Sequence, residues 1–251
     1  MNINKSILGM RVDVTSIAKA VTKIKALIED GRGHYICVST VHMCMESYDD
    51  NTFQKIVNNA DFVVPDGRPL VWAQYLLGAR DAKQTRGIDL MLALCEVASA
   101  LRLPIGFYGT TQKKLAKLRY IMKMRFPGIK ITNTIAPPFR LLTSDENDEY
   151  INMINKSGTR ILFVGIGCPK QERWMAENKF KLNCVMIGVG AAFDFIIGSK
   201  RQAPRWIQYL GFEWFYRLIS EPKRLWRRYL IHNPRFILYF ITQLIKTKIS
   251  S

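Results

Sequence analysis

The stretch Arg160–Trp174, RILFVGIGCPKQERW, indicates the fold class of this chain. Four apolar residues, Ile161–Val164, precede Gly165 and Gly167, and Pro169 then precedes the polar run KQERW. A short apolar run that ends in glycines is typical of a buried parallel strand leading into a tight loop. A proline followed by polar residues is typical of a helix start. The stretch therefore predicts a strand, a glycine loop and a helix in succession.

A strand, a glycine loop and a helix start together form a common type of anion site. The first N–H groups of the helix lack internal partners, and the helix dipole favours negative charge there. Lys170 would add a full positive charge. We interpret the stretch as a diphosphate pocket, most simply for a nucleotide-sugar. The alternative is an ordinary turn with solvated polar residues, because glycine-rich loops also occur without ligands.

Along most of the chain, short apolar runs alternate with segments whose apolar residues recur at helical spacing. The other expected strands are Ile7–Val14, His34–Ser39, Phe62–Val64, Pro104–Tyr108, Ile129–Asn133 and Cys184–Val189. This alternation predicts the α/β class, with a Rossmann-like, doubly wound, mostly parallel sheet over residues 1–199.

Two further segments lie where such a sheet binds ligands, at the carboxyl ends of its strands. Asp66 follows the expected strand Phe62–Val64, although Asp-Gly is also a common turn. A second glycine loop, with Gly188, Gly190 and Asp194, follows the last expected strand. Asp194 could instead serve only as a helix cap.

The charge of the chain indicates an anionic partner. Lys and Arg number 37 against 20 Asp and Glu, a formal net charge of +17. From Lys200 to Ser251 there are 11 basic residues and 2 acidic ones, so about +9 lies in the last fifth of the chain. This segment shows no strand pattern and is rich in Trp. We expect residues 200–251 to form a basic, aromatic, helical C-terminal appendage that contacts an anionic membrane surface.

Several classes of protein fit the sequence poorly. The five cysteines form no CxxC pair and the three histidines show no metal-ligand spacing, so we expect reduced thiols, no cofactor and no metal. The longest apolar run, Phe236–Ile245, falls short of the roughly 18 residues that a membrane span needs. Gly165 and Gly167 are only the first two glycines of a dinucleotide-binding GxGxxG, so a nicotinamide-dependent oxidoreductase is the weaker enzyme alternative. A basic nucleic-acid-binding module is the non-enzyme alternative.

Five sequence blocks together resemble the WecG/TagA/CpsF family of bacterial glycosyltransferases. They are VVPDGRPLVWA (Val63–Ala73), GIDLM (Gly87–Met91), LFVGIGCPKQERWM (Leu162–Met175), IGVGAAFDFIIGSKRQAP (Ile187–Pro204) and GFEWFYRLISEPKRLWRRYL (Gly211–Leu230). The resemblance runs from about Ile7 to the end of the chain.

This resemblance implies an inverting, metal-independent transfer of a hexose. The donor would be a UDP-sugar and the acceptor a sugar on a polyprenyl diphosphate, in cell-surface or exopolysaccharide synthesis. Residues 200–251 would close the active site over the donor diphosphate, and the protein would be cytoplasmic and peripherally attached to the inner face of the cell membrane. No nucleic-acid partner is expected, and the resemblance leaves open whether the protein forms a homo-oligomer. The absence of any Asp-x-Asp sequence agrees with a metal-independent reaction.

The resemblance also implies roles for particular residues. Asp66 matches the proposed general base, and Thr40 and Gln171 match two other catalytic positions. We expect the donor to bind at Gly165, Gly167, Lys170, Gly188, Gly190, Asp194, Arg224, Arg227 and Arg228, and the acceptor to bind near His42 and Arg86. His42 could equally be structural, whereas the three arginines could form a solvated face, although their clustering next to Trp226 favours a role facing an anion.

Two departures from the family pattern bear on the sugar. The teichoic-acid members read TPNAE where this chain reads Thr40–Cys44, TVHMC, so an acidic residue is missing. They also carry an Arg where this chain has Gln84, with Arg86 nearby. These departures favour a hexose donor over N-acetylmannosamine, the sugar of a teichoic-acid-type transferase.

Overall fold

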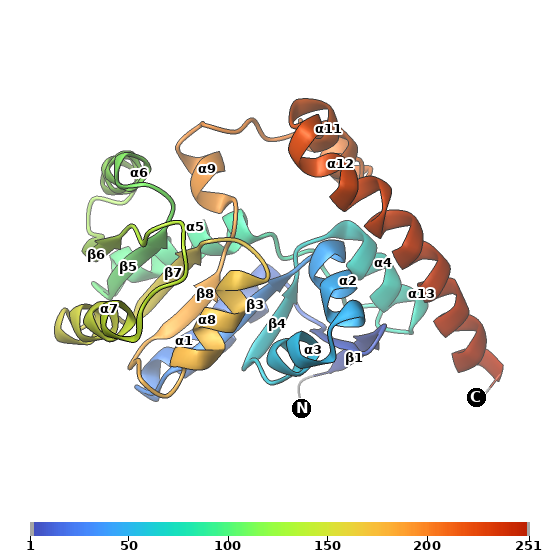
Figure 1. The fold of residues 1–251 in the computed structure, drawn as a ribbon, viewed down its shortest axis with the longest axis horizontal. Helices are drawn as coiled ribbons and strands as arrows, with labels where there is room; N and C mark the ends of the chain where they lie inside the picture. Colours follow the sequence, from blue (N-terminus) through green and yellow to red (C-terminus); the bar gives the residue numbers. More distant parts are fainter. Residues whose placement is uncertain (1–2, 250–251) are drawn as a thin grey trace.

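The computed structural model describes residues 3–249, with the backbone alone at 205, 209 and 228. Its centre is a sheet of six parallel strands in the order β4-β3-β8-β7-β5-β6 (Figure 1). The strands are β3 (His34–Ser39), β4 (Phe62–Pro65), β5 (Pro104–Gly109), β6 (Lys130–Ile135), β7 (Ile161–Gly165) and β8 (Val185–Gly188). Apart from the first one, the expected strands are confirmed, and so is the doubly wound α/β class.

Helices cover both faces of the sheet and bury two apolar clusters against it. One cluster draws side chains from α2 (Val41–Asp49), α3 (Asn51–Asn58), α4 (Arg68–Leu76), α7 (Ser144–Lys156) and α8 (Lys170–Asn178). The other draws them from α1 (Ile17–Glu29), α5 (Gly87–Ala100), α6 (Gln112–Arg125) and α9 (Ala192–Ile196). The chain leaves β3 and β7 toward one face but leaves β8 and β5 toward the other. Crevices therefore open between these neighbouring strands at their carboxyl ends.

The first expected strand, Ile7–Val14, is wrong. The structure has a two-stranded antiparallel hairpin there, β1 (Asn4–Ile7) and β2 (Met10–Asp13), separate from the main sheet. Leu8 and Gly9 between the strands have φ angles of 50° and 83°, the left-handed values of a two-residue hairpin turn. The sequence analysis missed the turn because Leu8 is not a residue that normally marks one.

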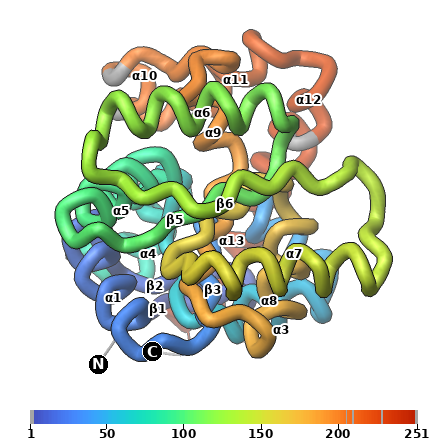
Figure 2. The backbone as a smooth tube through the Cα atoms, turned by 90° about the vertical axis from the view of Figure 1, so that its left-hand side faces the viewer, coloured from blue at the N-terminus to red at the C-terminus, as the bar shows by residue number. Residues whose placement is uncertain are grey.

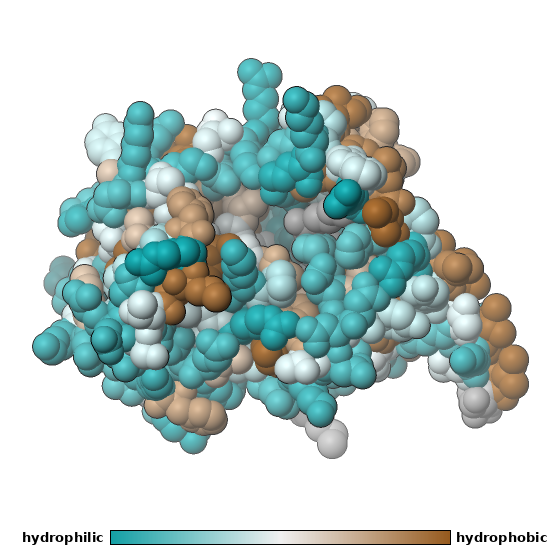
Figure 3. All heavy atoms as spheres, viewed as in Figure 1, coloured by the Kyte–Doolittle hydropathy of each residue, from teal (hydrophilic) through white to brown (hydrophobic). Residues whose placement is uncertain are grey.

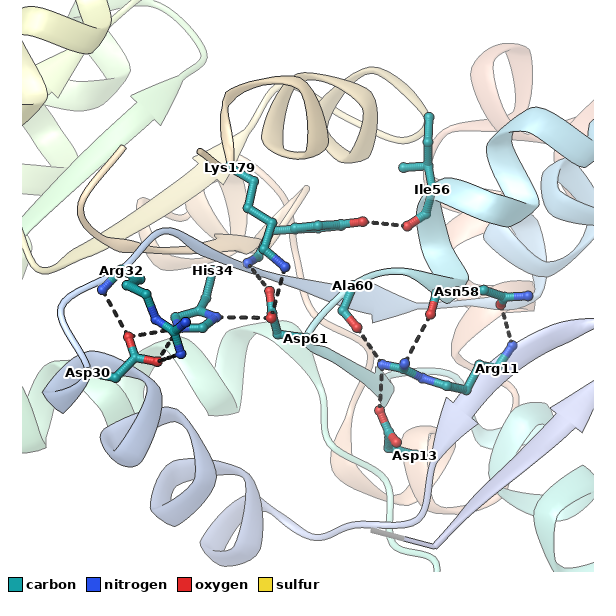
Figure 4. A network of polar contacts seen from close by, with 11 residues as sticks. Arg11, Asp13, Asp30, Arg32, His34, Ile56, Asn58, Ala60, Asp61 and Lys179 are labelled. Atoms are coloured by element: carbon teal, nitrogen blue, oxygen red, sulfur yellow. Dashed lines mark hydrogen bonds and ion pairs between the residues drawn. The ribbon is translucent and has the colours of Figure 1, made fainter. Parts of the chain in front are cut away.

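A polar network fastens the hairpin to the main sheet (Figure 4). The Arg11 guanidinium donates to the backbone oxygens of Asn58, at 3.0 Å, and Ala60, at 2.6 Å. Asp13, which is almost fully buried, accepts from the backbone N–H of Val63 in β4 at 2.8 Å. These bonds tie β2 to the loop before β4 and to β4 itself.

Asp61, at the amino end of β4, joins three elements. Its carboxylate lies 2.9 Å from His34 Nδ1 and 3.0 Å from Lys179 Nζ, and it accepts from the Tyr35 N–H at 2.9 Å (Figure 4). Burial opposes ionisation, but the hydrogen bonds from His34, Tyr35 and Lys179 hold the pKa of Asp61 below its usual range. Asp61 thus connects β4, β3 and the end of α8 at the edge of the sheet opposite the crevices.

The C-terminal segment is helical, as predicted. It forms α10 (Arg205–Tyr209), α11 (Glu213–Ser220), α12 (Pro222–Leu230) and α13 (His232–Ile249). Figures 1 and 2 both show α11 and α12 at the top of the molecule, beyond α9, and Figure 1 shows α13 descending beside α2 and β1. Within residues 3–249 every helix is too short or too polar to cross a bilayer.

Helix α13 packs firmly on the N-terminal part of the chain. Phe236 and Phe240 are buried in the apolar cluster that contains α2. The Gln243 side chain accepts from the Leu8 N–H at 2.8 Å and donates to the Ser6 backbone oxygen at 2.7 Å. A truncation before Phe236 would therefore uncover the core.

We predict that Asp61→Asn destabilises the fold by about 2 kcal/mol at pH 7, because it removes a partly buried carboxylate from charged partners. The pKa of Asp61 is lower in the folded state, so its contribution is complete above the unfolded value of about 4 and is lost as pH falls below it. Urea unfolding of both proteins from pH 7 to pH 2.5 should show the difference shrinking in acid.

Asp148→Asn is the matched control for this prediction. Asp148 pairs with Lys181 at 3.1 Å, but both side chains are more than half exposed. This change should alter the unfolding free energy by less than about 0.5 kcal/mol. A difference between wild type and Asp61→Asn that does not change with pH would contradict the ionic role of Asp61.

Candidate active site

The carboxyl ends of β3, β4, β7 and β8 surround a hollow of about 250 Å³, which we call the central pocket. Helices α2, α4, α5 and α8 begin beside it, at Val41, Arg68, Gly87 and Lys170. The first N–H groups of a helix have no internal acceptors, and its dipole is positive at that end. The helix starts gathered here therefore favour a negatively charged ligand.

Two other hollows adjoin the central pocket. The side pocket, of about 80 Å³, lies between the start of α4 and helices α11 to α13, and it shares Thr40, Asp66 and Arg217 with the central pocket. The outer pocket, of about 730 Å³, lies beyond β7 and β5. It shares with the central pocket Gly165, Gly190, Asp194 and Arg224. The three hollows are therefore neighbours along one edge of the sheet.

Asp66 stands at the boundary between the central and side pockets. Its Oδ1 accepts from the Gly87 N–H, at the start of α5, at 2.9 Å. Burial, reinforced by the negative charge of Glu213, raises the pKa of Asp66 to about 6, against the lowering effects of the Gly87 bond and of Arg217 and Arg86. A carboxyl group with this pKa can accept and release a proton near neutral pH.

Thr40 and Gln171 also line the central pocket, as predicted from the sequence. Thr40 caps α2, and its hydroxyl accepts from the Met43 N–H at 3.4 Å. Gln171 is buried, and its Oε1 accepts from the Gly167 N–H at 3.2 Å. Its Nε2 donates to the buried Glu172 carboxyl at 2.7 Å. Burial raises the pKa of Glu172 to about 7, although the bond from Gln171 opposes the shift.

The glycines of the two predicted loops line the central pocket. Gly167 has a φ of 89°, a conformation that other residues rarely adopt. Gly188 faces Gln171, and a Cβ at this position would lie 2.8 Å from Gln171 Nε2. Gly165 and Gly190 border both the central and outer pockets, whereas Lys170 lines only the outer one.

Asp194 holds two lysines beside the central pocket. Its carboxylate lies 2.7 Å from Lys114 Nζ and 3.5 Å from Lys200 Nζ, and it accepts from the Ser199 hydroxyl at 2.9 Å. Burial opposes ionisation, but the Lys114 and Ser199 bonds lower the pKa of Asp194. In the first turn of α9, it thus connects α6 to the start of the C-terminal segment.

The three predicted donor arginines occupy different places. Arg224 lines both the central and outer pockets, and its Nε donates to Glu221 at 2.6 Å. The Arg227 guanidinium lies over the Trp226 ring, 5.2 Å from its centroid, and lines none of the three hollows. The side chain of Arg228 is outside the described part of the structure.

The two predicted acceptor residues lie on either side of Asp66. His42 lines the side pocket, together with Gln84, whose Nε2 donates to the Asp66 backbone oxygen at 2.6 Å. Arg86 instead lines the central pocket. Its guanidinium pairs with Asp89 at 2.6 and 2.9 Å and donates to the Gln208 side chain.

The sequence analysis missed two site residues, Glu213 and Arg217 on α11. Both line the central and side pockets. Arg217 also lies over the Phe195 ring, 5.4 Å from its centroid. Their sequence signal was the block GFEWFYRL, in which they lie one helical turn apart. Only the fold could show that this turn faces Asp66, about 150 residues earlier in the chain.

The position that carries an acidic residue in the teichoic-acid pattern lies away from the pockets. Cys44, which occupies that position, is fully buried, and its thiol donates to the Ile7 backbone oxygen at 3.5 Å. His42, which stands where the teichoic-acid pattern TPNAE has Asn, and Gln84 both line the side pocket. The differences from the teichoic-acid pattern therefore concern the side pocket and not a contact from position 44.

Comparison with known proteins gives consistent matches over nearly the whole chain. Residues 5–250 match the Glycosyl transferase WecG/TagA/CpsF family, so the resemblance seen in the sequence blocks is confirmed. The N-acetylglucosaminyldiphosphoundecaprenol N-acetyl-beta-D-mannosaminyltransferase of Staphylococcus aureus (strain MW2) is 27% identical over 225 residues, covering 88% of this chain and 86% of that protein. The protein of the same name from Bacillus spizizenii is 27% identical over 211 residues, covering 84% and 79%.

Proposed function

Because this glycosyltransferase belongs to the WecG/TagA/CpsF family, we propose that it transfers a hexose from a UDP-sugar to a sugar carried on a polyprenyl diphosphate. The observation that carries the proposal is the place of Asp66, a carboxyl group with a pKa of about 6 at the boundary of two pockets. A glycosyl transfer needs a base between a donor site and an acceptor site.

The central pocket suits the donor diphosphate. Four helix starts converge there, and Arg217, Arg224 and Lys200 line it. Backbone N–H groups and cationic side chains of this kind stabilise the charge that develops on a departing diphosphate. The outer pocket continues from the same loops and has room for a nucleoside. We therefore place the UDP across these two hollows.

The side pocket suits the acceptor. Trp214, Tyr229 and Asn233 line it opposite Asp66, so a sugar there would meet aromatic and polar groups together. Part of its wall comes from α11 to α13, helices that also carry many exposed apolar side chains. A sugar attached to a polyprenyl chain could reach the side pocket from that surface.

The reaction then follows from these positions. The Asp66 carboxylate takes the proton of the acceptor hydroxyl as its oxygen attacks the anomeric carbon of the donor sugar. The new C–O bond forms as the C–O bond to UDP breaks, which inverts the anomeric configuration. UDP leaves with the bonding electron pair, and the cations and N–H groups of the central pocket hold its charge. We assign Thr40 and Gln171 to positioning the donor sugar, and we assign Arg86, which lines the central pocket, to the same side of the reaction and not to the acceptor.

The identity of the donor sugar is the most specific part of the proposal. The two relatives are named for transfer of N-acetylmannosamine to N-acetylglucosaminyldiphosphoundecaprenol. We propose a lipid-linked sugar acceptor of the same kind. For the donor we propose a hexose of exopolysaccharide synthesis, because this chain departs from the teichoic-acid sequence pattern at Thr40–Cys44.

We also propose that the protein binds the inner face of the membrane through α11 to α13. Brown, apolar atoms line the outer edge of α13 in Figure 3. The exposed apolar residues of these helices are Phe215, Ile219, Trp226, Leu230, Ile231, Ile237, Leu238, Ile241, Ile245 and Ile249. The basic residues of the segment add attraction to anionic lipids.

A donor panel on a lipid-linked acceptor tests the proposed function. UDP-glucose, UDP-galactose and UDP-N-acetylmannosamine are each offered with N-acetylglucosaminyldiphosphoundecaprenol, with and without EDTA. We expect a hexose donor to give the highest turnover, with inversion, and EDTA to change it less than about twofold, because side chains and N–H groups stabilise the leaving UDP. Higher turnover with UDP-N-acetylmannosamine would assign this chain the activity named for its relatives. No transfer from any of the three donors would contradict the proposal.

A further prediction concerns Asp66. Asp66→Asn should lower turnover by roughly 10²–10⁴, the usual contribution of a general base, and should leave UDP affinity unchanged in calorimetry. Because the base must be deprotonated, kcat/KM of the wild type should rise with pH, level off above about 6 and fall tenfold per unit below it. Turnover near the wild-type level in the variant would exclude Asp66 as the base.

Another prediction concerns binding to the membrane. The triple change Ile237→Ser, Leu238→Ser and Ile241→Ser should weaken binding to anionic vesicles roughly a hundredfold, because about 1 kcal/mol is lost per apolar side chain. Sedimentation with vesicles at low and high salt measures it. A matched triple change of exposed residues elsewhere, Met124→Ser, Leu141→Ser and Phe180→Ser, should have little effect. Equal losses in the two proteins would show that α13 is not the membrane face.

A further inference from the structure

Two histidines and a glutamate meet where α13 begins beside α2. His42 and Glu46 lie one turn apart on α2, and His42 Nδ1 is 3.6 Å from Glu46 Oε1. The His232 ring, at the first residue of α13, packs edge-to-face against His42 with 5.3 Å between centroids. One potential ligand atom of each of the three residues lies within 4.8 Å of the others, and all three side chains are half-buried.

These three side chains form the kind of ligand set that zinc prefers. Two imidazole nitrogens and one carboxylate oxygen are the protein ligands of many zinc sites, with bonds of roughly 2.0–2.2 Å. Tetrahedral geometry places such ligand atoms about 3.3 Å apart. The separations here are up to 4.8 Å, so small rotations of the side chains would close the set. Residues four apart on a helix also lie on the same face, as the two α2 ligands of a single ion must.

We propose that His42, Glu46 and His232 bind one divalent cation of the zinc class, which fastens the start of α13 to α2. The three residues are half-buried, so a water molecule could complete the coordination. Among the described residues no other group of three potential ligands comes together in this way.

The surroundings support a fastening role. Asp49, at the end of α2, is paired with Arg235 of α13, and the Arg235 hydrogen bond lowers the pKa of Asp49. Arg235, the basic residue that faces this part of α2, is held by Asp49 at 2.6 and 2.9 Å and so is already neutralised. Tyr48 and Tyr239 stack with 4.8 Å between centroids. The cation would thus add a third link to an interface already made by an ion pair and an aromatic pair.

The fastened helix forms part of the side pocket. Tyr229 and Asn233, on either side of His232 in the chain, line that pocket together with His42. A cation at this position would therefore stabilise a wall of the pocket without contacting the donor diphosphate. The inference depends only on the side-chain cluster and does not require the proposed transfer reaction.

Metal binding by the purified, chelator-treated full chain tests the proposal directly. Co²⁺ is titrated first, because its visible spectrum distinguishes four-coordinate from six-coordinate sites, and Zn²⁺ is then used to displace it. We expect one equivalent of Co²⁺ with four-coordinate bands, displacement by Zn²⁺, and no competition from Mg²⁺. Zn²⁺ should also raise Tm, because a ligand that binds only the folded state stabilises it.

Variants and controls locate the ion. His232→Gln and Glu46→Gln keep the side-chain size, and each should weaken Co²⁺ binding at least about tenfold and remove the Zn²⁺ effect on Tm. Asp148→Asn removes an exposed carboxylate elsewhere and should change neither result. Cys168→Ser checks the one cysteine that is not fully buried. Wild-type Co²⁺ affinity in both ligand variants, a sulfur-to-cobalt charge-transfer band that Cys168→Ser abolishes, or no stoichiometric binding by the wild type would each overturn the assignment.

Discussion

The parallel arrangement of the six strands is the constraint on which the site depends. In a parallel sheet every strand ends at the same edge, and every following helix begins there. At β3, β4, β7 and β8 this brings four chain segments and the positive ends of their helices to one hollow. A negatively charged ligand is favoured there before any side chain is considered. The basic side chains then strengthen a preference that the backbone has already set.

Helix α11 completes the hollow from a part of the chain that does not contribute to the sheet. The negative charge of Glu213 adds to burial in raising the pKa of Asp66 to about 6, and the positive charge of Arg217 opposes the rise. The same helix separates the central pocket from the side pocket. Its position therefore affects both the ionisation of Asp66 and the space available to the two substrates.

The position of α11 depends in turn on the helices around it. Phe236 and Phe240 bury α13 in the core, and Gln243 bonds the N-terminal hairpin. The hairpin itself is held to β4 by Arg11 and Asp13. The two ends of the chain thus support one another at some distance from the pockets. One face of α13 serves this packing, while the opposite, apolar face stays exposed.

The sequence by itself determined the local elements and the edge of the sheet where the site lies. Short apolar runs predicted most of the strands, because a buried parallel strand is apolar throughout, and the loops after some of them need residues such as Gly167 with positive φ. Asp66 could be chosen because it stands just after such a strand, whereas Thr40 and Gln171 were chosen through the resemblance of the sequence blocks to the family. The sequence did not predict the hairpin turn at Leu8, because the conformation of this turn is stabilised by pairing between β1 and β2 and not by residue type.

Only the tertiary structure decided which distant residues meet. Arg217 and Glu213 reach Asp66, and His232 reaches His42, because helices packed across the sheet edge bring together segments about 150 to 190 residues apart. The tertiary structure also gives different places to two nearby arginines. Arg224 lines the pockets, whereas Arg227, three positions later in the chain, lies over the Trp226 ring. Local patterns report the preferences of neighbouring residues, whereas contacts between distant segments depend on which surfaces pack together with the largest apolar burial and the fewest unpaired polar groups.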